Sequence, residues 1–68
     1  MVKRWTIKEE IDGETWWVIR GGAFTNVINE SYPRRLFESR EDADEYCHRI
    51  NMRTDRNAKV VKVKTKWL

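Results

Sequence analysis

The first part of the chain alternates apolar and polar residues with the period of a half-buried β-strand. Trp5 and Ile7 alternate with polar neighbours, and the run that begins at Thr15 is rich in tryptophan and β-branched residues, which suit a pleated surface. Asp12-Gly13 stands between the two runs. This pair is the strongest short-range hairpin signal, because a type I′ turn needs a positive φ at both central residues. We therefore predict a β-hairpin that turns at Asp12-Gly13.

A helix is predicted over about residues 40–53. Ser39 precedes it as the N-cap, and Asp42 three residues later approximates a capping box. Acidic residues occupy the first turns and arginines the end, which is the arrangement that the helix dipole favours. The apolar residues have the i, i+3, i+4, i+7 spacing of one buried face. They are Ala43, Tyr46, Cys47 and Ile50.

The segment between hairpin and helix, residues 21–38, has no regular period. Gly21-Gly22 lets the backbone turn, and Pro33 breaks regular strand pairing. Phe24 belongs to a group of apolar residues that we expect to pack or to form a short irregular strand. The stretch RRLFE predicts a further short strand that carries an apolar side chain to the core.

The C-terminal stretch AKVVKVKTKWL alternates cleanly and predicts a final strand with one apolar and one cationic face. The residues expected on the apolar face are Val61, Val63 and Thr65, and those on the cationic face are Lys62, Lys64 and Lys66.

These elements predict an α+β fold in a single domain over residues 1–68, in the order strand, strand, optional short strand, helix, strand. A small antiparallel sheet of three to four strands with one helix packed on one face is the two-layer solution for this order. The other face of the sheet is left to solvent or to a partner.

The adjacent residues Trp16 and Trp17 must point to opposite faces of the sheet. A two-residue turn at Asp12-Gly13 places Trp16 on the core face with Ile7, and Trp17 on the other face. A one-residue change in the turn would exchange the two tryptophans, so the sequence leaves open which of them is exposed.

Three explanations remain for Trp17. The 21–38 segment can cover it and complete a second small core, or Trp17 can anchor a protein contact, or it can stack on a base of nucleic acid. On an uncovered face, Trp17 would lie among cations, which is how single strands are commonly held. These cations would be Arg4, Lys8, Lys62, Lys64 and Lys66.

Charge is distributed unevenly along the chain, whose net charge is +3. Residues 49–68 carry seven basic and one acidic side chain, whereas residues 1–30 and 31–48 each have a small acidic excess. Such asymmetry suggests an anionic partner, nucleic acid first, although basic residues on a solvated strand also simply aid solubility.

The sequence shows no catalytic or metal-binding signature. His48 and Cys47 are neighbours on the predicted helix, so they point about 100° apart and do not converge on one metal or substrate atom. Cys47 lies on the apolar helix face, where we expect an inert core thiol. Gly21-Gly22 lacks the rest of any phosphate-binding loop. We expect no enzymatic activity, no cofactor and no metal.

Cellular location is indicated by what the sequence lacks. A single cysteine forms no internal disulfide, no apolar leader opens the chain, and no apolar run approaches the ~20 residues of a membrane-spanning helix. We expect a cytoplasmic protein without a membrane partner.

The pattern WWVIR, RLFESREDADEYCHRI and VVKV resembles that of many very small phage and prokaryotic proteins, in which a tryptophan-bearing hairpin precedes an F-x-S-x-x-x-A helix start. Phe37, Ser39 and Ala43 match that helix start. Members with a known role are often host-takeover factors that bind and block a bacterial enzyme, and similar modules in phage integrases bind DNA through the sheet. The resemblance implies a binding module, in the cytoplasm of a bacterial host if phage-encoded, and assigns no functional residue.

The sequence therefore predicts a non-catalytic regulatory or inhibitory module that docks on a larger protein. The candidate protein contacts are Trp17, Phe24, Tyr32, Arg34 and Arg35. The alternative is a nucleic-acid-binding protein that uses the basic C-terminal strand. Its candidate contacts are Trp17, Arg49, Arg53, Arg56, Lys59, Lys62, Lys64 and Lys66. An edge strand could also pair with a second copy to form a homodimer.

Overall fold

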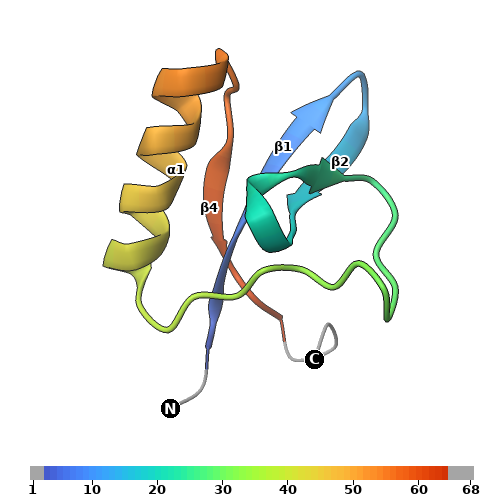
Figure 1. The fold of residues 1–68 in the computed structure, drawn as a ribbon, viewed down its shortest axis with the longest axis horizontal. Helices are drawn as coiled ribbons and strands as arrows, with labels where there is room; N and C mark the ends of the chain where they lie inside the picture. The colour runs from blue at the N-terminus through green and yellow to red at the C-terminus, as the bar shows by residue number, and fades with distance from the viewer. Residues whose placement is uncertain (1–2, 65–68) are drawn as a thin grey trace.

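The computed structural model describes residues 3–64 and shows a four-stranded antiparallel sheet with one long helix on one of its faces (Figure 1). The strands are β1 (Trp5–Ile11), β2 (Glu14–Val18), β3 (Phe24–Thr25) and β4 (Lys59–Lys62). The helix is α1 (Arg40–Thr54), and a single 3-10 turn, η1 (Arg20–Gly22), follows β2. The strand order in the sheet is β3-β2-β1-β4. The predicted α+β fold is confirmed.

The β1–β2 hairpin has the register that the sequence predicts. Lys8 lies opposite Trp17 and Glu9 opposite Trp16. The two turn residues, Asp12 and Gly13, have φ values of 51° and 82°, which are the positive angles that a type I′ turn requires. This register sends Trp16 to the face that carries α1 and Trp17 to the opposite face.

The core lies between the sheet and α1. Ile7 and Val18 are fully buried at its centre. Its other members are Phe37, Ala43, Cys47 and Ala58. As predicted, α1 begins after Ser39, whose Oγ accepts a hydrogen bond of 3.1 Å from the backbone N of Asp42.

Trp16 is half-buried and is not part of this core, so its predicted place there is wrong. The reason is the length of the helix relative to the hairpin. Glu9, directly opposite Trp16, bonds the backbone of Asn57 in the turn that follows α1. The helix therefore ends at the level of the Glu9–Trp16 pair. The part of the hairpin between this pair and the Asp12-Gly13 turn is not covered by α1.

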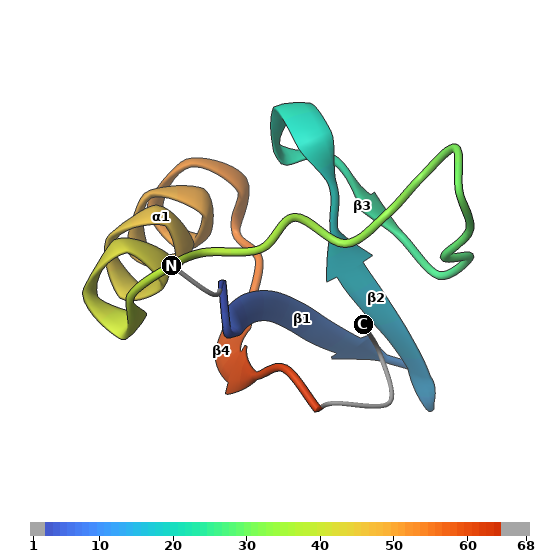
Figure 2. The same ribbon diagram turned by 90° about the horizontal axis from the view of Figure 1, so that it is seen from below.

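Residues 26–38, which we call the strap, run from the end of β3 to the start of α1 and pass the open end of the β1–β2 hairpin (Figure 2). Beyond the Lys8–Trp17 pair, β1 and β2 exchange backbone bonds with the strap. Arg35 N donates to Val18 O at 2.9 Å, and Phe37 N donates to Trp5 O at 2.7 Å. The stretch predicted as a further strand therefore forms two isolated bridges, and the additional strand of the sheet is β3.

Trp17 is buried beneath the strap, with 9% of its surface exposed. The guanidinium of Arg34 lies 4.3 Å from the centre of the indole ring. Beside it, Thr6 is fully buried and its hydroxyl donates a 2.8 Å hydrogen bond to Arg35 O. Of the three explanations for Trp17, the structure supports the covered one, and the uncovered sheet face is a wrong prediction.

The cationic face of the last strand also differs from the prediction. β4 pairs with β1 so that Lys62 lies opposite Trp5 and Val61 opposite Thr6. Because directly paired residues share a face, Lys62 points to the α1 side and Val61 to the Trp17 side. The predicted grouping of Trp17 with Lys62 is therefore wrong. Lys66 and Thr65 lie outside the described residues.

Candidate binding surfaces

The residues predicted to contact a protein have very different accessibility. Trp17 is buried, and Arg34, which covers it, is half-buried. Phe24 is half-buried, and the Arg56 guanidinium lies 4.2 Å from its ring centre. Tyr32 projects into solvent with 54% of its surface exposed. Trp17 is thus unavailable as the predicted exposed anchor, whereas Tyr32 is available.

Arg35 is the remaining predicted contact, and it is exposed but engaged on the α1 side. Its guanidinium lies 4.6 Å from the ring centre of Tyr46 and donates a 3.4 Å hydrogen bond to the Tyr46 hydroxyl. The Phe37 ring lies 5.3 Å from the Tyr46 ring, centre to centre. These contacts fix the end of the strap against α1.

The turn of the strap has a defined conformation. The side-chain Oδ1 of Asn29 accepts hydrogen bonds of 2.9 Å from the backbone N of both Ser31 and Tyr32. At the start of the strap, the Thr25 hydroxyl accepts a bond of 3.1 Å from Val27 N. Val27 is 57% exposed. The strap therefore presents two exposed apolar side chains, Val27 and Tyr32, from a backbone that local hydrogen bonds hold.

Two hollows flank the strap turn and share Glu30 and Pro33. The larger has a volume of about 450 Å³, and the smaller about 260 Å³. The larger is lined by Ile19, Arg20, Glu30, Ser31, Tyr32 and Pro33. The smaller is lined by Ile28, Asn29, Glu30, Pro33, Arg34, Leu36 and Val63. Apolar side chains contribute to both linings, so each hollow can accept an apolar side chain of a partner.

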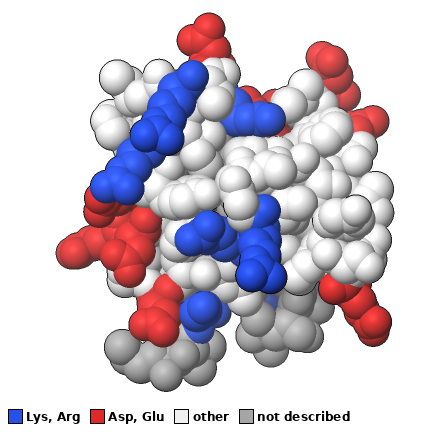
Figure 3. Space-filling model, in the orientation of Figure 1, with Lys and Arg blue, Asp and Glu red and all other residues white. Residues whose placement is uncertain are grey.

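A third hollow, of about 290 Å³, lies between α1 and the Gly21-Gly22 turn, and we call it the arginine groove. It is lined by Gly21, Gly22, Tyr46, Arg49, Ile50, Arg53, Thr54 and Arg56. Figure 3 shows Lys and Arg side chains over the C-terminal half of α1 and Asp and Glu side chains over its N-terminal half. The structure thus brings together three arginines from the predicted nucleic-acid set.

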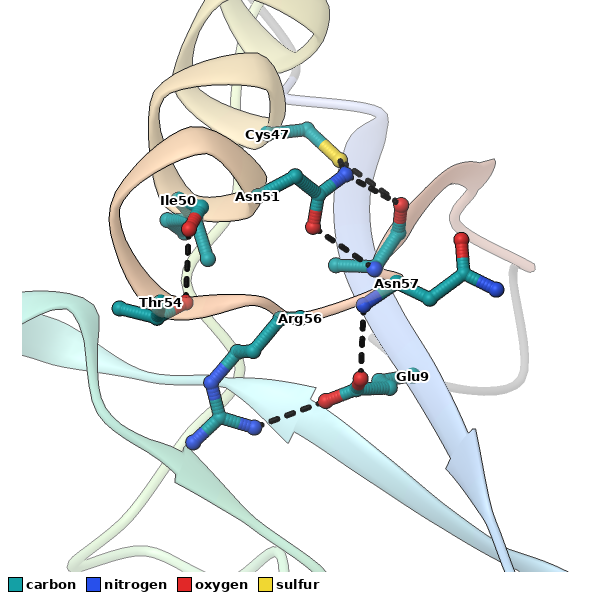
Figure 4. A network of polar contacts seen from close by, with 8 residues as sticks. Glu9, Cys47, Ile50, Asn51, Thr54, Arg56 and Asn57 are labelled. Atoms are coloured by element: carbon teal, nitrogen blue, oxygen red, sulfur yellow. Dashed lines mark hydrogen bonds and ion pairs between the residues drawn. The ribbon is translucent and has the colours of Figure 1, made fainter.

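A polar network holds the chain after α1 to the sheet (Figure 4). Both Glu9 carboxylate oxygens accept 2.8 Å bonds, one from Arg56 Nη1 and one from Asn57 N. The Asn51 amide exchanges two hydrogen bonds with the backbone of Ala58, at 2.9 and 3.1 Å. These bonds fix the position of Arg56 at the end of the groove.

The charge state of Glu9 follows from this network. Its side chain is 10% exposed, and burial acts to raise the pKa of its carboxyl. The hydrogen bonds from Asn57 and Arg56, with the positive charge of Arg56, together outweigh burial, so the Glu9 pKa lies below its ordinary value. Glu9 stays ionised near neutral pH and neutralises part of the Arg56 charge.

No protein-family model, curated protein sequence or solved structure matches this chain.

Cys47 is buried on the core face of α1, as the sequence predicts. Burial raises the pKa of its thiol, and its Sγ lies 3.2 Å from Ala58 O. Within residues 3–64, no three His, Cys, Asp or Glu side chains are grouped so that they could hold a metal ion. The same residues contain no helix long and apolar enough to cross a membrane.

Among the described residues 3–64, the lysines of the predicted nucleic-acid set, Lys59, Lys62 and Lys64, do not line the arginine groove. Lys59 borders a separate hollow of about 70 Å³ with Lys8, Glu10 and Asn57. Lys62 is exposed at the far edge of the sheet, on the strand that borders only β1. The residues that sequence reasoning missed are the groove walls, Gly21-Gly22 and Tyr46. The i, i+4 spacing of Arg49 and Arg53 was the available signal for the shared surface.

Proposed function

We propose that this chain is a non-catalytic binding module that docks on a larger protein through the strap turn, with a regulatory or inhibitory effect on that protein. The observation that carries the proposal is the pair of exposed apolar side chains, Val27 and Tyr32, on a turn whose backbone is held by its own hydrogen bonds. A surface that is already ordered loses little conformational freedom on binding.

Tyrosine suits the role of an interface anchor. It supplies a large contact area with few rotatable bonds and is enriched among the residues that dominate binding energy. Tyr32 also lines the larger hollow, so an apolar side chain of the partner that fills this hollow would pack directly against it. In this proposal Tyr32 takes the anchoring role that the sequence gave to Trp17.

The charges around the strap turn indicate the chemistry of the partner surface. Arg20 and Glu30 both border the larger hollow, so this surface carries charges of both signs. A partner surface with an apolar side chain between a carboxylate and a basic side chain would be complementary in shape and charge. We therefore propose that the partner presents such a surface.

Site-specific photo-crosslinking tests this proposal. A photoreactive amino acid replaces Tyr32 in one variant and Met52 in a matched control, because Met52 is 73% exposed on α1, away from the strap. Both variants are irradiated in a prokaryotic lysate. We expect one discrete protein to be cross-linked from position 32 and not from position 52, and the unlabelled chain should compete for it.

A cross-link that forms equally from both positions, or only from position 52, contradicts docking through the strap turn. The absence of any competed cross-link from position 32 contradicts it as well. Circular dichroism of both variants establishes that the fold is intact before irradiation.

A further inference from the structure

The arginine groove lies on the α1 side of the molecule and is independent of the strap turn. Arg49 and Arg53 are four residues apart on α1, which separates their backbones by about 6 Å along the helix axis and leaves both side chains on one face. Arg56 borders the same hollow. Three arginine residues thus line a space of about 290 Å³.

Part of this charge is already neutralised within the protein. Arg49 bonds Glu45 on the preceding turn, and Arg56 bonds Glu9. Arg53 makes no ion pair with any residue in the described range 3–64. Each guanidinium has five N–H donors, so Arg49 and Arg56 keep donors beyond the bonds that they make. The groove therefore offers one uncompensated charge and several further donors.

A phosphate group matches this donor arrangement. Its oxygens accept hydrogen bonds in several directions, and the planar guanidinium fork binds phosphate with two parallel bonds. A single carboxylate has fewer acceptor oxygens and would use fewer of the donors.

The wall opposite α1 is built of glycines for a geometric reason. Gly21 and Gly22 have φ values of 84° and 86°, a conformation that side chains of other residues disfavour. A Cβ on Gly22 would lie 2.9 Å from the Tyr46 hydroxyl. Gly22 thus lets the backbone approach Tyr46 closely, and neither glycine places a side chain at the mouth of the groove.

The remaining lining is partly apolar and limits the ligand further. Ile50 and Tyr46 are half-buried, and the Thr54 hydroxyl is bonded to Ile50 O. The volume, about 290 Å³, lies just below the ~300–1,000 Å³ range of small-molecule sites, so it fits only a small ligand. An apolar surface beside guanidinium groups favours an anion that also carries a planar or apolar portion.

We propose that the arginine groove binds a nucleoside phosphate, with the phosphate on Arg49 and Arg53 and the nucleoside against Ile50 and Tyr46. The same chemistry occurs in a free nucleotide and in one unit of a single-stranded nucleic acid. The site does not depend on the strap turn, so failure of either proposal leaves the other standing.

Nuclear magnetic resonance titration tests the proposal on the full chain. The probes are adenosine monophosphate, inorganic phosphate and a single-stranded DNA oligonucleotide, each at low and at raised salt. We expect saturable shifts of the backbone amide signals of Gly21, Gly22 and Arg53, with adenosine monophosphate binding more tightly than inorganic phosphate. Tighter binding of the oligonucleotide, with a log–log salt slope of about −0.7 per phosphate contact, identifies the strand as the source. Tighter binding of the mononucleotide identifies the free nucleotide.

Two arginine variants on the same helix give the matched comparison. Arg53→Gln should weaken nucleotide binding about tenfold, which is the effect of losing one charge-assisted contact. Arg40→Gln removes the same charge from the other end of α1 and should change the affinity less than about twofold. Both side chains are at the helix surface, so both variants should keep the fold, which circular dichroism checks.

Several results would overturn the proposal. These are equal weakening by Arg53→Gln and Arg40→Gln, shifts that avoid the glycine turn, and inorganic phosphate binding as tightly as the nucleotide. A phosphoserine peptide that binds the groove more tightly than either nucleic-acid probe would assign the site to a phosphorylated protein instead.

Discussion

Replacing each of the adjacent tryptophans by alanine should have very different effects on stability. Trp17 is 9% exposed under the strap, so Trp17→Ala removes an indole ring that is almost fully buried. A buried tryptophan side chain covers about 150–250 Å², which corresponds to ~4–6 kcal/mol at ~25 cal/mol per Å². Measured truncations of this kind cost about 3–5 kcal/mol. The change also removes the ring beneath Arg34.

The expected loss is large relative to the whole stability of the domain. At about 0.05–0.15 kcal/mol per residue, a chain of 68 residues has roughly 3–10 kcal/mol to lose. Trp16 is half-buried and outside the core, so by the same coefficient Trp16→Ala should cost about half as much, ~2–3 kcal/mol.

Urea denaturation at pH 7, followed by far-ultraviolet circular dichroism, measures both changes without relying on tryptophan emission. If Trp17→Ala is unfolded without urea, Trp17→Phe and Trp16→Phe supply the same comparison with smaller losses. A loss at Trp16 equal to or greater than the loss at Trp17 would refute the argument that the strap makes a second core.

Three further predictions concern the turn, the helix and the carboxylate. Gly21→Ala should cost about 1–2 kcal/mol because of its positive φ alone, and Gly22→Ala should cost more because its Cβ also meets Tyr46; urea denaturation of the pair tests the difference. Ser39→Ala should lower the free energy of unfolding by about 1 kcal/mol through loss of the N-cap bond, measured in the same way. The pKa of Glu9 is lower in the folded protein than in the unfolded chain. The stability that Glu9 contributes is therefore complete above the pKa of the unfolded state and is lost as pH falls through the pKa of the folded state. Glu9→Gln should reduce the pH dependence of the free energy of unfolding below about pH 5.

Local features explain why parts of the fold could be predicted from the sequence. The hairpin register follows from Asp12-Gly13, because a two-residue turn leaves one way to pair the strands. The start of α1 follows from Ser39, whose side chain bonds a backbone group three residues away. Each of these features depends on residues that are close in the chain, so no knowledge of tertiary structure was needed.

The errors arose where contacts between distant segments decide the structure. The direction of Lys62 depends on its pairing with Trp5, and nothing near Lys62 in the sequence specifies that register. Burial of Trp17 depends on the strap, whose backbone bonds Val18 and Trp5. Because residues 21–38 have no regular period, their apolar residues did not indicate which face of the sheet they would cover.

The arginine groove illustrates the same limit. Spacing alone places Arg49 and Arg53 on one helix face. The facing wall, Gly21-Gly22, precedes the strap in the sequence, whereas α1 follows it. Glycines carry no side chain, so periodicity could not assign them to a surface.

The central claim is that the chain docks on a protein through the strap turn. The dissociation constant of its complex with the protein that is cross-linked from position 32 tests this claim most directly. It is measured with the purified partner for the unmodified chain, for Tyr32→Ala and for Met52→Ala, at equal ionic strength. Tyr32→Ala should weaken binding at least about tenfold, the effect of removing one interface anchor, and Met52→Ala should leave it nearly unchanged. Equal affinities for the unmodified chain and Tyr32→Ala would contradict docking through the strap turn.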